Sequence, residues 1–120
     1  MAIGYDICMA HACVMLGIPF VAAVPFLGQE SRWPETSRVR YASLLRRASH
    51  VQMVCEGEYA AWKMQKRNEY MMDRATLCLA LYNGKPKGGT ANAVAYAERI
   101  GLQILNLWSS WERLCRDRDS

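Results

Sequence analysis

A glycine-rich segment, Lys85-Pro86-Lys87-Gly88-Gly89-Thr90-Ala91-Asn92, carries the most recognisable chemistry of this sequence. Glycines let a backbone approach an anion closely, and the free N–H groups at the start of a helix attract a phosphate. The Thr90 hydroxyl adds a donor and Lys87 adds a positive charge. The pattern indicates a phosphate-binding turn, although the spacing is equally typical of a tight strand-to-helix turn that Thr90 caps.

A second group of polar side chains lies in the helical pattern at 60–74. Arg67 and Asn68 fall on or beside its apolar stripe, where a polar group needs a partner. That partner is a ligand or simply a loop carbonyl. Asp73 lies near the end of the helix, where its charge opposes the helix dipole, so we expect Arg74 or a ligand hydroxyl to compensate it.

A third group is the segment Gln29-Glu30-Ser31-Arg32-Trp33, in a loop after an apolar run. The carboxylate of Glu30, the guanidinium of Arg32 and the indole of Trp33 form a mixture that is able to contact a sugar and stack on a base. The same composition is also typical of a surface loop with a local ion pair.

Composition excludes several classes of protein. The chain has 120 residues, which fits one domain, and its net charge of +4 is modest. The longest apolar run, 18–26, is too short to span a membrane, and no basic region marks a signal peptide. The five cysteines are odd in number and lack CxxC spacing, which predicts free thiols in a reducing cytosol. The two histidines show no ligand spacing, so no metal site is expected.

The elements that must position these residues alternate between apolar strands and amphipathic helices. This order predicts a Rossmann-like α/β domain over 1–107, a three-layer α-β-α fold around a mostly parallel sheet of about four strands, followed by a tail at 108–120. In such sheets, ligands bind at the carboxyl ends of the strands. Strands are expected at 18–26, 51–55, 76–82 and 102–107, and helices from Asp6, as a cap, to Gly17 and at about 36–48, 60–74 and 90–100.

Several stretches occur together in a recognisable order. They are Ile3-Gly4-Tyr5-Asp6, Val24-Pro25-Phe26, Gly28 to Pro34, Met64-Gln65, Arg67-Asn68-Glu69, Met72-Asp73, Gly88 to Asn92 and Tyr96-Ala97-Glu98-Arg99. In this order the chain resembles the SLOG superfamily of Rossmann-like proteins, and within it the YpsA-related branch, many of whose members come from phages.

The resemblance implies a nucleotide-type ligand, with its phosphate on the turn at 88–90. We expect no cofactor. It also turns polar residues from several segments into candidate pocket residues. The expected ligand-binding set is Asp6, Glu30, Arg32, Trp33, Arg67, Asn68, Asp73, Lys87, Gly88, Gly89, Thr90 and Asn92.

The sequence departs from the family pattern at the position where related hydrolases carry a catalytic glutamate, three residues after the threonine. Ala93 stands there, and Glu98 lies too far along the helix to replace it. We therefore expect a binder without catalytic residues. In a phage, such a protein would act as a sponge that sequesters a host immune nucleotide, such as a cyclic nucleotide or an ADP-ribose derivative, in the bacterial cytoplasm.

A second departure is that the family's usual first strand, helix and strand do not precede Ile3. Either the strand at 18–26 then pairs directly with 51–55, or an apolar edge stays exposed and invites pairing with another chain. We therefore expect a homo-oligomer.

Two other functions remain open. One is a nucleotide or nucleoside-phosphate hydrolase in which Glu30 or Asp73 supplies the carboxylate. The other is a nucleic-acid-binding module whose affinity would fall steeply with salt. Its basic residues would be Arg38, Arg40, Arg46 and Arg47, which also fit a solvated helix face.

Overall fold

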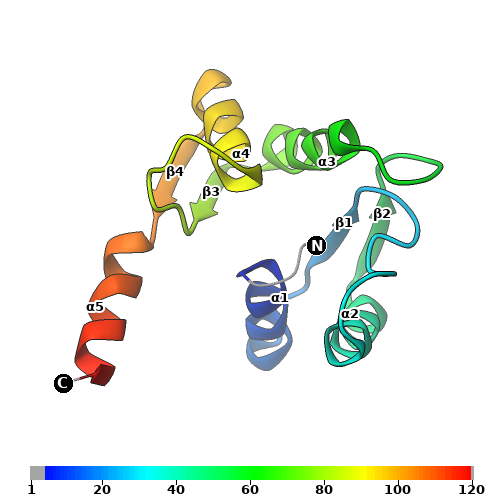
Figure 1. The fold of residues 1–120 in the computed structure, drawn as a ribbon, viewed down its shortest axis with the longest axis horizontal. Coiled ribbons are helices and arrows are strands. Elements are labelled where there is room, and N and C mark those ends of the chain that lie inside the picture. Colours follow the sequence, from blue (N-terminus) through cyan, green and yellow to red (C-terminus); the bar gives the residue numbers. More distant parts are fainter. Residues whose placement is uncertain (1–4, 120) are drawn as a thin grey trace. The chain divides into compact units, whose positions relative to one another are not determined.

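The computed structural model describes residues 5–119, so Ile3 and Gly4 of the family-like stretch lie outside the described residues. The chain forms two compact units, Met1–Arg67 and Asn68–Ser120, and the boundary falls inside the third helix. Helices and strands alternate in both units (Figure 1). In chain order the elements are α1 Tyr5–Leu16, β1 Val21–Val24, α2 Glu35–Arg47, β2 His50–Met53, α3 Ala61–Arg74, β3 Leu77–Ala80, α4 Gly89–Arg99, β4 Gln103–Asn106 and α5 Trp108–Asp119.

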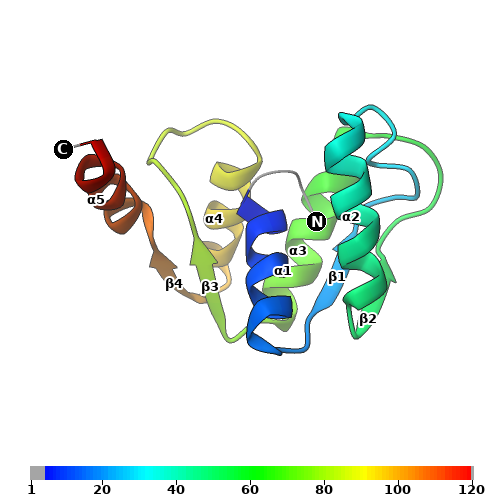
Figure 2. The ribbon, with the colours of Figure 1, turned by 90° about the horizontal axis from the view of Figure 1, so that it is seen from below.

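The first unit is built on β1 and β2, which run parallel with Val21 opposite His50 and Val24 opposite Met53. The direct pairing of these two strands, one of the two expected arrangements, is therefore confirmed. Both faces of β1 are covered, as its unbroken apolar sequence predicts. Figure 2 shows α1 and α2 in front of β1. The buried core of this unit consists of Ile7, Ala10, Ala22, Tyr41 and Leu44.

Helix α1 ends as its sequence predicts but does not begin as predicted. Gly17 takes the left-handed conformation with a φ of 68°, and its N–H donates to the carbonyl of Val14 at 3.2 Å while Ile18 N–H donates to Cys13. This is the glycine-terminated helix end of a Schellman motif. Asp6, however, lies inside the first turn of the helix and is not its cap. There its carboxylate is favoured by the positive end of the helix dipole.

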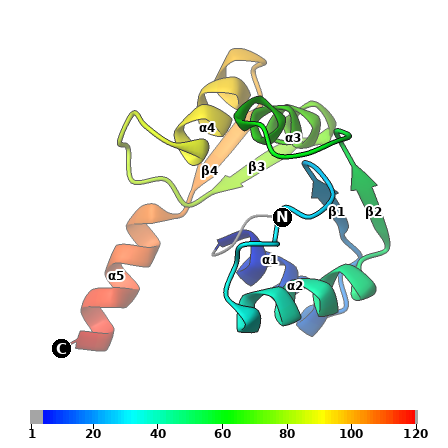
Figure 3. The same cartoon turned by 45° about the vertical axis from the view of Figure 1, so that its right-hand side comes forward.

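The second unit is built on β3 and β4, which are also parallel, with Leu77 opposite Gln103 and Ala80 opposite Asn106. Helix α4 packs against both strands and ends at Gly101, whose φ is 75°. Figure 3 shows α5 continuing from β4 and leading away from this sheet. The buried core of the unit consists of Cys78, Ala80, Val94 and Ala97.

The α/β class and the parallel pairing of the strands are confirmed. In the described part of the chain the four strands form two sheets of two. Each strand has only four residues. For β1 the reason is chemical: Pro19 and Pro25 stand on either side of it, and proline has no N–H to donate to a ladder. Within residues 5–119, no helix is long and apolar enough to cross a membrane.

Candidate functional site

The glycine turn opens directly into α4. Gly88 is the N-cap with a φ of 102° and a ψ of 176°, a conformation that is nearly exclusive to glycine. No side chain of the described residues caps this helix, so the alternative in which Thr90 is the cap is wrong; Thr90 lies one residue inside the helix. The first intrahelical bond runs from Asn92 N–H to the Gly88 carbonyl at 3.1 Å. The N–H groups of Gly89 and Thr90 therefore stand at an uncapped, electropositive helix end.

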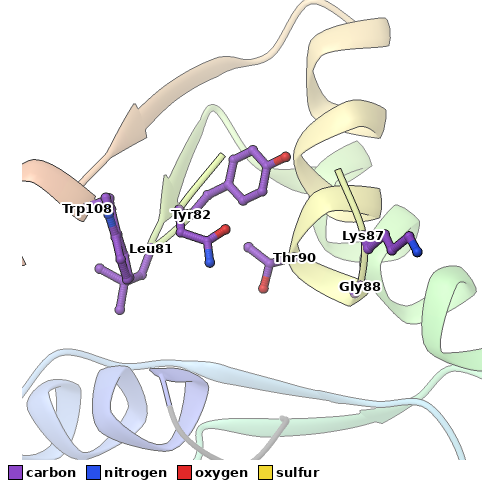
Figure 4. Close-up of a pocket in the computed structure, with 8 residues that line it drawn as sticks. Leu81, Tyr82, Lys87, Gly88, Thr90 and Trp108 are labelled. Atoms are coloured by element: carbon purple, nitrogen blue, oxygen red, sulfur yellow. The ribbon is translucent and has the colours of Figure 1, made fainter. Parts of the chain in front are cut away.

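The uncapped helix end faces a small pocket of about 170 Å³ in the second unit. In Figure 4, Trp108 lies on the opposite side of this pocket from Thr90 and Lys87. The pocket lies just beyond the carboxyl ends of β3 and β4, where a parallel sheet presents its ligand sites. Four predicted site residues line it and Asn92 does not. The lining residues are Leu81, Tyr82, Asn83, Lys87, Gly88, Gly89, Thr90 and Trp108.

Asn106 holds two residues that line the pocket, Tyr82 and Trp108, by hydrogen bonds. The sequence analysis did not single out this asparagine. Its Oδ1 accepts the N–H of Tyr82 and the N–H of Trp108, each at 3.1 Å. Its Nδ2 donates to the Tyr82 carbonyl at 2.8 Å. The amide thus extends the pairing of β3 with β4 and forms an Asx turn into α5. The sequence signal was available, because an asparagine between an apolar strand and a helix start is typical of such a turn.

Asp73 belongs to an internal contact of the second unit. The Tyr96 hydroxyl donates to its Oδ1 at 2.6 Å, and this hydrogen bond raises the pKa of Tyr96. Arg74, one expected partner, instead donates to the Tyr70 carbonyl at 3.1 Å and lies over the Tyr70 ring. Asp73 is not among the residues that line the pocket.

Arg67 is buried in the first unit, as its place on the helix stripe predicts, with 5% of its surface exposed. Burial lowers the pKa of its guanidinium, and the charges of Asp6 and Tyr41 oppose that shift. Burial raises the pKa of Tyr41 to about 12, and Glu30 adds to the increase. Asp6, Glu30 and Arg67 are thus coupled electrostatically around one buried tyrosine. Asn68, at the start of the second unit, is half-buried.

The first unit has its own cleft, of about 730 Å³, beyond the carboxyl ends of β1 and β2. Arg32 and Trp33 of the predicted set line it, and Glu30 does not. The lining residues are Phe26, Leu27, Gly28, Gln29, Ser31, Arg32, Trp33, Glu58, Tyr59 and Met64. The predicted residues therefore belong partly to each unit: the glycine turn is part of the second unit, and the loop after β1 is part of the first.

The loop that supplies Glu58 and Tyr59 to the cleft is held by a residue that the sequence did not single out. Lys63, only 7% exposed, donates from Nζ to the carbonyls of Glu56 and Glu58. Its sequence context, between tryptophan and methionine on an amphipathic helix, gave no signal of burial.

The chain is similar to a family of known proteins. The model of the YpsA family, described as the YspA SLOG family, matches residues 17–109. The chain belongs to the YpsA SLOG family. It is also similar to the uncharacterized SPbeta prophage-derived protein YoqJ of Bacillus subtilis, with 34% identity over 100 residues, 72% of this chain and 58% of that protein. The UPF0398 protein BH1768 of Halalkalibacterium halodurans is 29% identical over 83 residues, 68% of this chain and 44% of that protein.

The chain thus spans about half the length of the curated relatives it matches. Membership of the YpsA SLOG family confirms the resemblance seen in the sequence. The prophage origin of one relative agrees with the expected association with phages.

Proposed function

We propose that this YpsA SLOG family protein binds a nucleotide-derived ligand whose phosphate rests on the N–H groups of Gly89 and Thr90. The uncapped start of α4, open to the pocket beside Lys87, is the observation that carries the proposal. A hydrogen bond to a charged group contributes roughly 1.5–3 kcal/mol, and the helix dipole favours the same anion. Gly88 lets the chain reach this geometry because a φ of 102° is strained for other residues.

The ligand is bound without being turned over. Among the described residues that line the pocket there is no carboxylate and no histidine, and Ala93 occupies the place of the hydrolases' glutamate. The Asp73 carboxylate already accepts the Tyr96 hydroxyl. General acid–base catalysis contributes typically 10²–10⁴-fold to such hydrolyses, and nothing along this pocket supplies it.

The biological role that fits an inert binder is sequestration. Family membership and the prophage-derived relative support a phage sponge that withdraws a signalling nucleotide, a cyclic nucleotide or an ADP-ribose derivative, from a bacterial host. A sponge profits from inertness because its ligand persists as long as the complex does.

The first test is to identify the ligand that the protein carries out of cells. The protein is purified, denatured by heat, and the supernatant is analysed by mass spectrometry. A stoichiometric nucleotide that is absent from a Gly89→Val preparation supports the proposal. A preparation that carries no nucleotide, and that binds none of a panel of cyclic dinucleotides, ADP-ribose derivatives and nucleoside monophosphates in calorimetry, would overturn it.

A further inference from the structure

The cleft of the first unit is a built site for which the glycine turn gives no explanation. Its volume of about 730 Å³ falls within the roughly 300–1,000 Å³ of small-molecule pockets, whereas the pocket at the turn is far smaller. We propose that this cleft binds a planar aromatic ring, the base of a nucleoside, against the aromatic side chains of Trp33 and Tyr59 that line it. The choice of a nucleoside base among aromatic rings rests on the proposed function.

Trp33 forms a fixed wall of the cleft. Its ring meets the buried ring of Tyr41 edge to face, with the ring centroids 5.1 Å apart and the planes at 77°. Trp33 also packs against the hydrophobic core of the unit, and it is only half-buried. The core therefore holds the indole while part of its surface stays available to a ligand in the cleft.

Tyr59 forms a second, exposed part of the cleft wall. Its ring meets Phe26 edge to face at 5.9 Å and 73°, yet 70% of the Tyr59 surface is exposed. Phe26 follows β1 and Tyr59 lies in the loop after β2; these two loops run side by side in Figures 2 and 3. Aromatic side chains left open at a cleft favour stacking with a planar ring, because every base has a π-face.

Lys63 is the positioning residue of the Tyr59 wall. A buried ammonium group is costly unless it is hydrogen-bonded, and Lys63 meets this need with the Glu56 and Glu58 carbonyls. Gly57 lies between those two residues with a φ of 79°, and a side chain there would begin 3.2 Å from Lys63 Nζ. The lysine therefore fixes the loop before any ligand arrives, which lowers the entropic cost of binding.

The ligand chemistry follows from the lining. The walls are aromatic and apolar, and the polar groups are few: Arg32, Ser31, Gln29 and Glu58. Such a site selects a flat ring with carbonyl or ring-nitrogen acceptors for Arg32, and it tolerates different bases. Loss of one stacking partner typically weakens binding by about 5- to 150-fold.

The experiment titrates adenosine and guanosine, which carry no phosphate, into the full chain and follows binding by calorimetry. We expect both nucleosides to bind, Tyr59→Ala to weaken them at least about fivefold, and Tyr59→Phe to retain them because the ring is kept. Ile100→Ala is the control, since Ile100 is 43% exposed and does not line the cleft.

Lys63→Met tests the positioning role, because it removes the ammonium group and keeps a long, unbranched side chain. It should weaken nucleoside binding. When Tyr59→Ala is added to Lys63→Met, the further loss of nucleoside affinity should be much smaller than in the parent. If this variant does not fold, Gly57→Ala disturbs the same loop from the surface and should weaken nucleosides likewise. Equal nucleoside binding by the parent and Tyr59→Ala, or nucleotide binding without nucleoside binding, would overturn the cleft assignment and leave the proposed function standing. Failure of nucleotides and nucleosides alike would overturn both.

Discussion

Replacement of Gly89 by valine should weaken ligand binding at the turn and leave the protein folded. Gly89 does not need a left-handed φ, and a Cβ built on it meets no atom within 4 Å, so the protein fold has room for a side chain. A phosphate on the Gly89 and Thr90 N–H groups would compete for that space. Loss of one charge-assisted hydrogen bond costs about 1.5–3 kcal/mol, which corresponds to roughly 10- to 150-fold in Kd.

The assay is calorimetric titration of the panel of nucleotides named above, with circular dichroism melts of each variant. Ala95→Val, a valine on the exposed side of α4, is the matched control and should bind as the parent does. Gly88→Ala is the opposite case, because a φ of 102° strains any side chain, by about 1–3 kcal/mol of folding free energy. Unchanged nucleotide affinity in a folded Gly89→Val protein would refute the phosphate assignment.

Three further predictions concern other parts of the chain. Asn106→Ala should weaken nucleotide binding and lower the stability of the second unit by about 1–3 kcal/mol, because two backbone N–H groups and a carbonyl lose their partner; denaturant titration with calorimetry checks both. The free energy of unfolding should fall as the pH rises from 10 towards 12, because Tyr41 loses its proton at a lower pH in the unfolded chain than in the folded protein, and Tyr41→Phe should reduce this fall. Urea titrations at pH 8 and 11 that give the same free energy of unfolding would contradict the prediction. The chain should be at least dimeric in light scattering, because α5 exposes Trp111 and Leu114, and substitution of both by serine should favour the monomer. A parent protein that is monomeric at micromolar concentration would contradict this expectation.

The sequence predicted those parts of the fold that depend on local chemistry. Gly17 and Gly101 marked helix ends because glycine favours the left-handed conformation that each end requires. The apolar run of β1 predicted a strand covered on both faces. The expected strand lengths were too long, because a run of apolar residues does not show where pairing stops. Asp6 was placed as a cap for a similar reason: residue type alone does not distinguish a cap from the first turn.

The sequence likewise predicted only those parts of the candidate site that depend on local chemistry. The turn at Gly88 was recognisable from neighbouring residues, because glycines at the start of a helix act on the local backbone. Tyr96 reaches Asp73 from a helix 23 residues away, and Asn106 meets Tyr82 only through the register of β3 and β4. Such contacts arise only when the chain folds, so spacing did not reveal them. Lys63 was missed because its partners are main-chain carbonyls, which leave no trace in the sequence.

We propose that the protein binds a nucleotide and leaves it intact. The most direct measurement mixes stoichiometric protein with cyclic dinucleotides and ADP-ribose derivatives, removes unbound ligand, denatures the complex by heat and analyses the supernatant by mass spectrometry. We expect recovery of the unchanged nucleotide in proportion to the protein. Accumulation of a cleaved product beyond one equivalent, lost on Glu30→Gln or Asp73→Asn, would contradict it and establish a hydrolase.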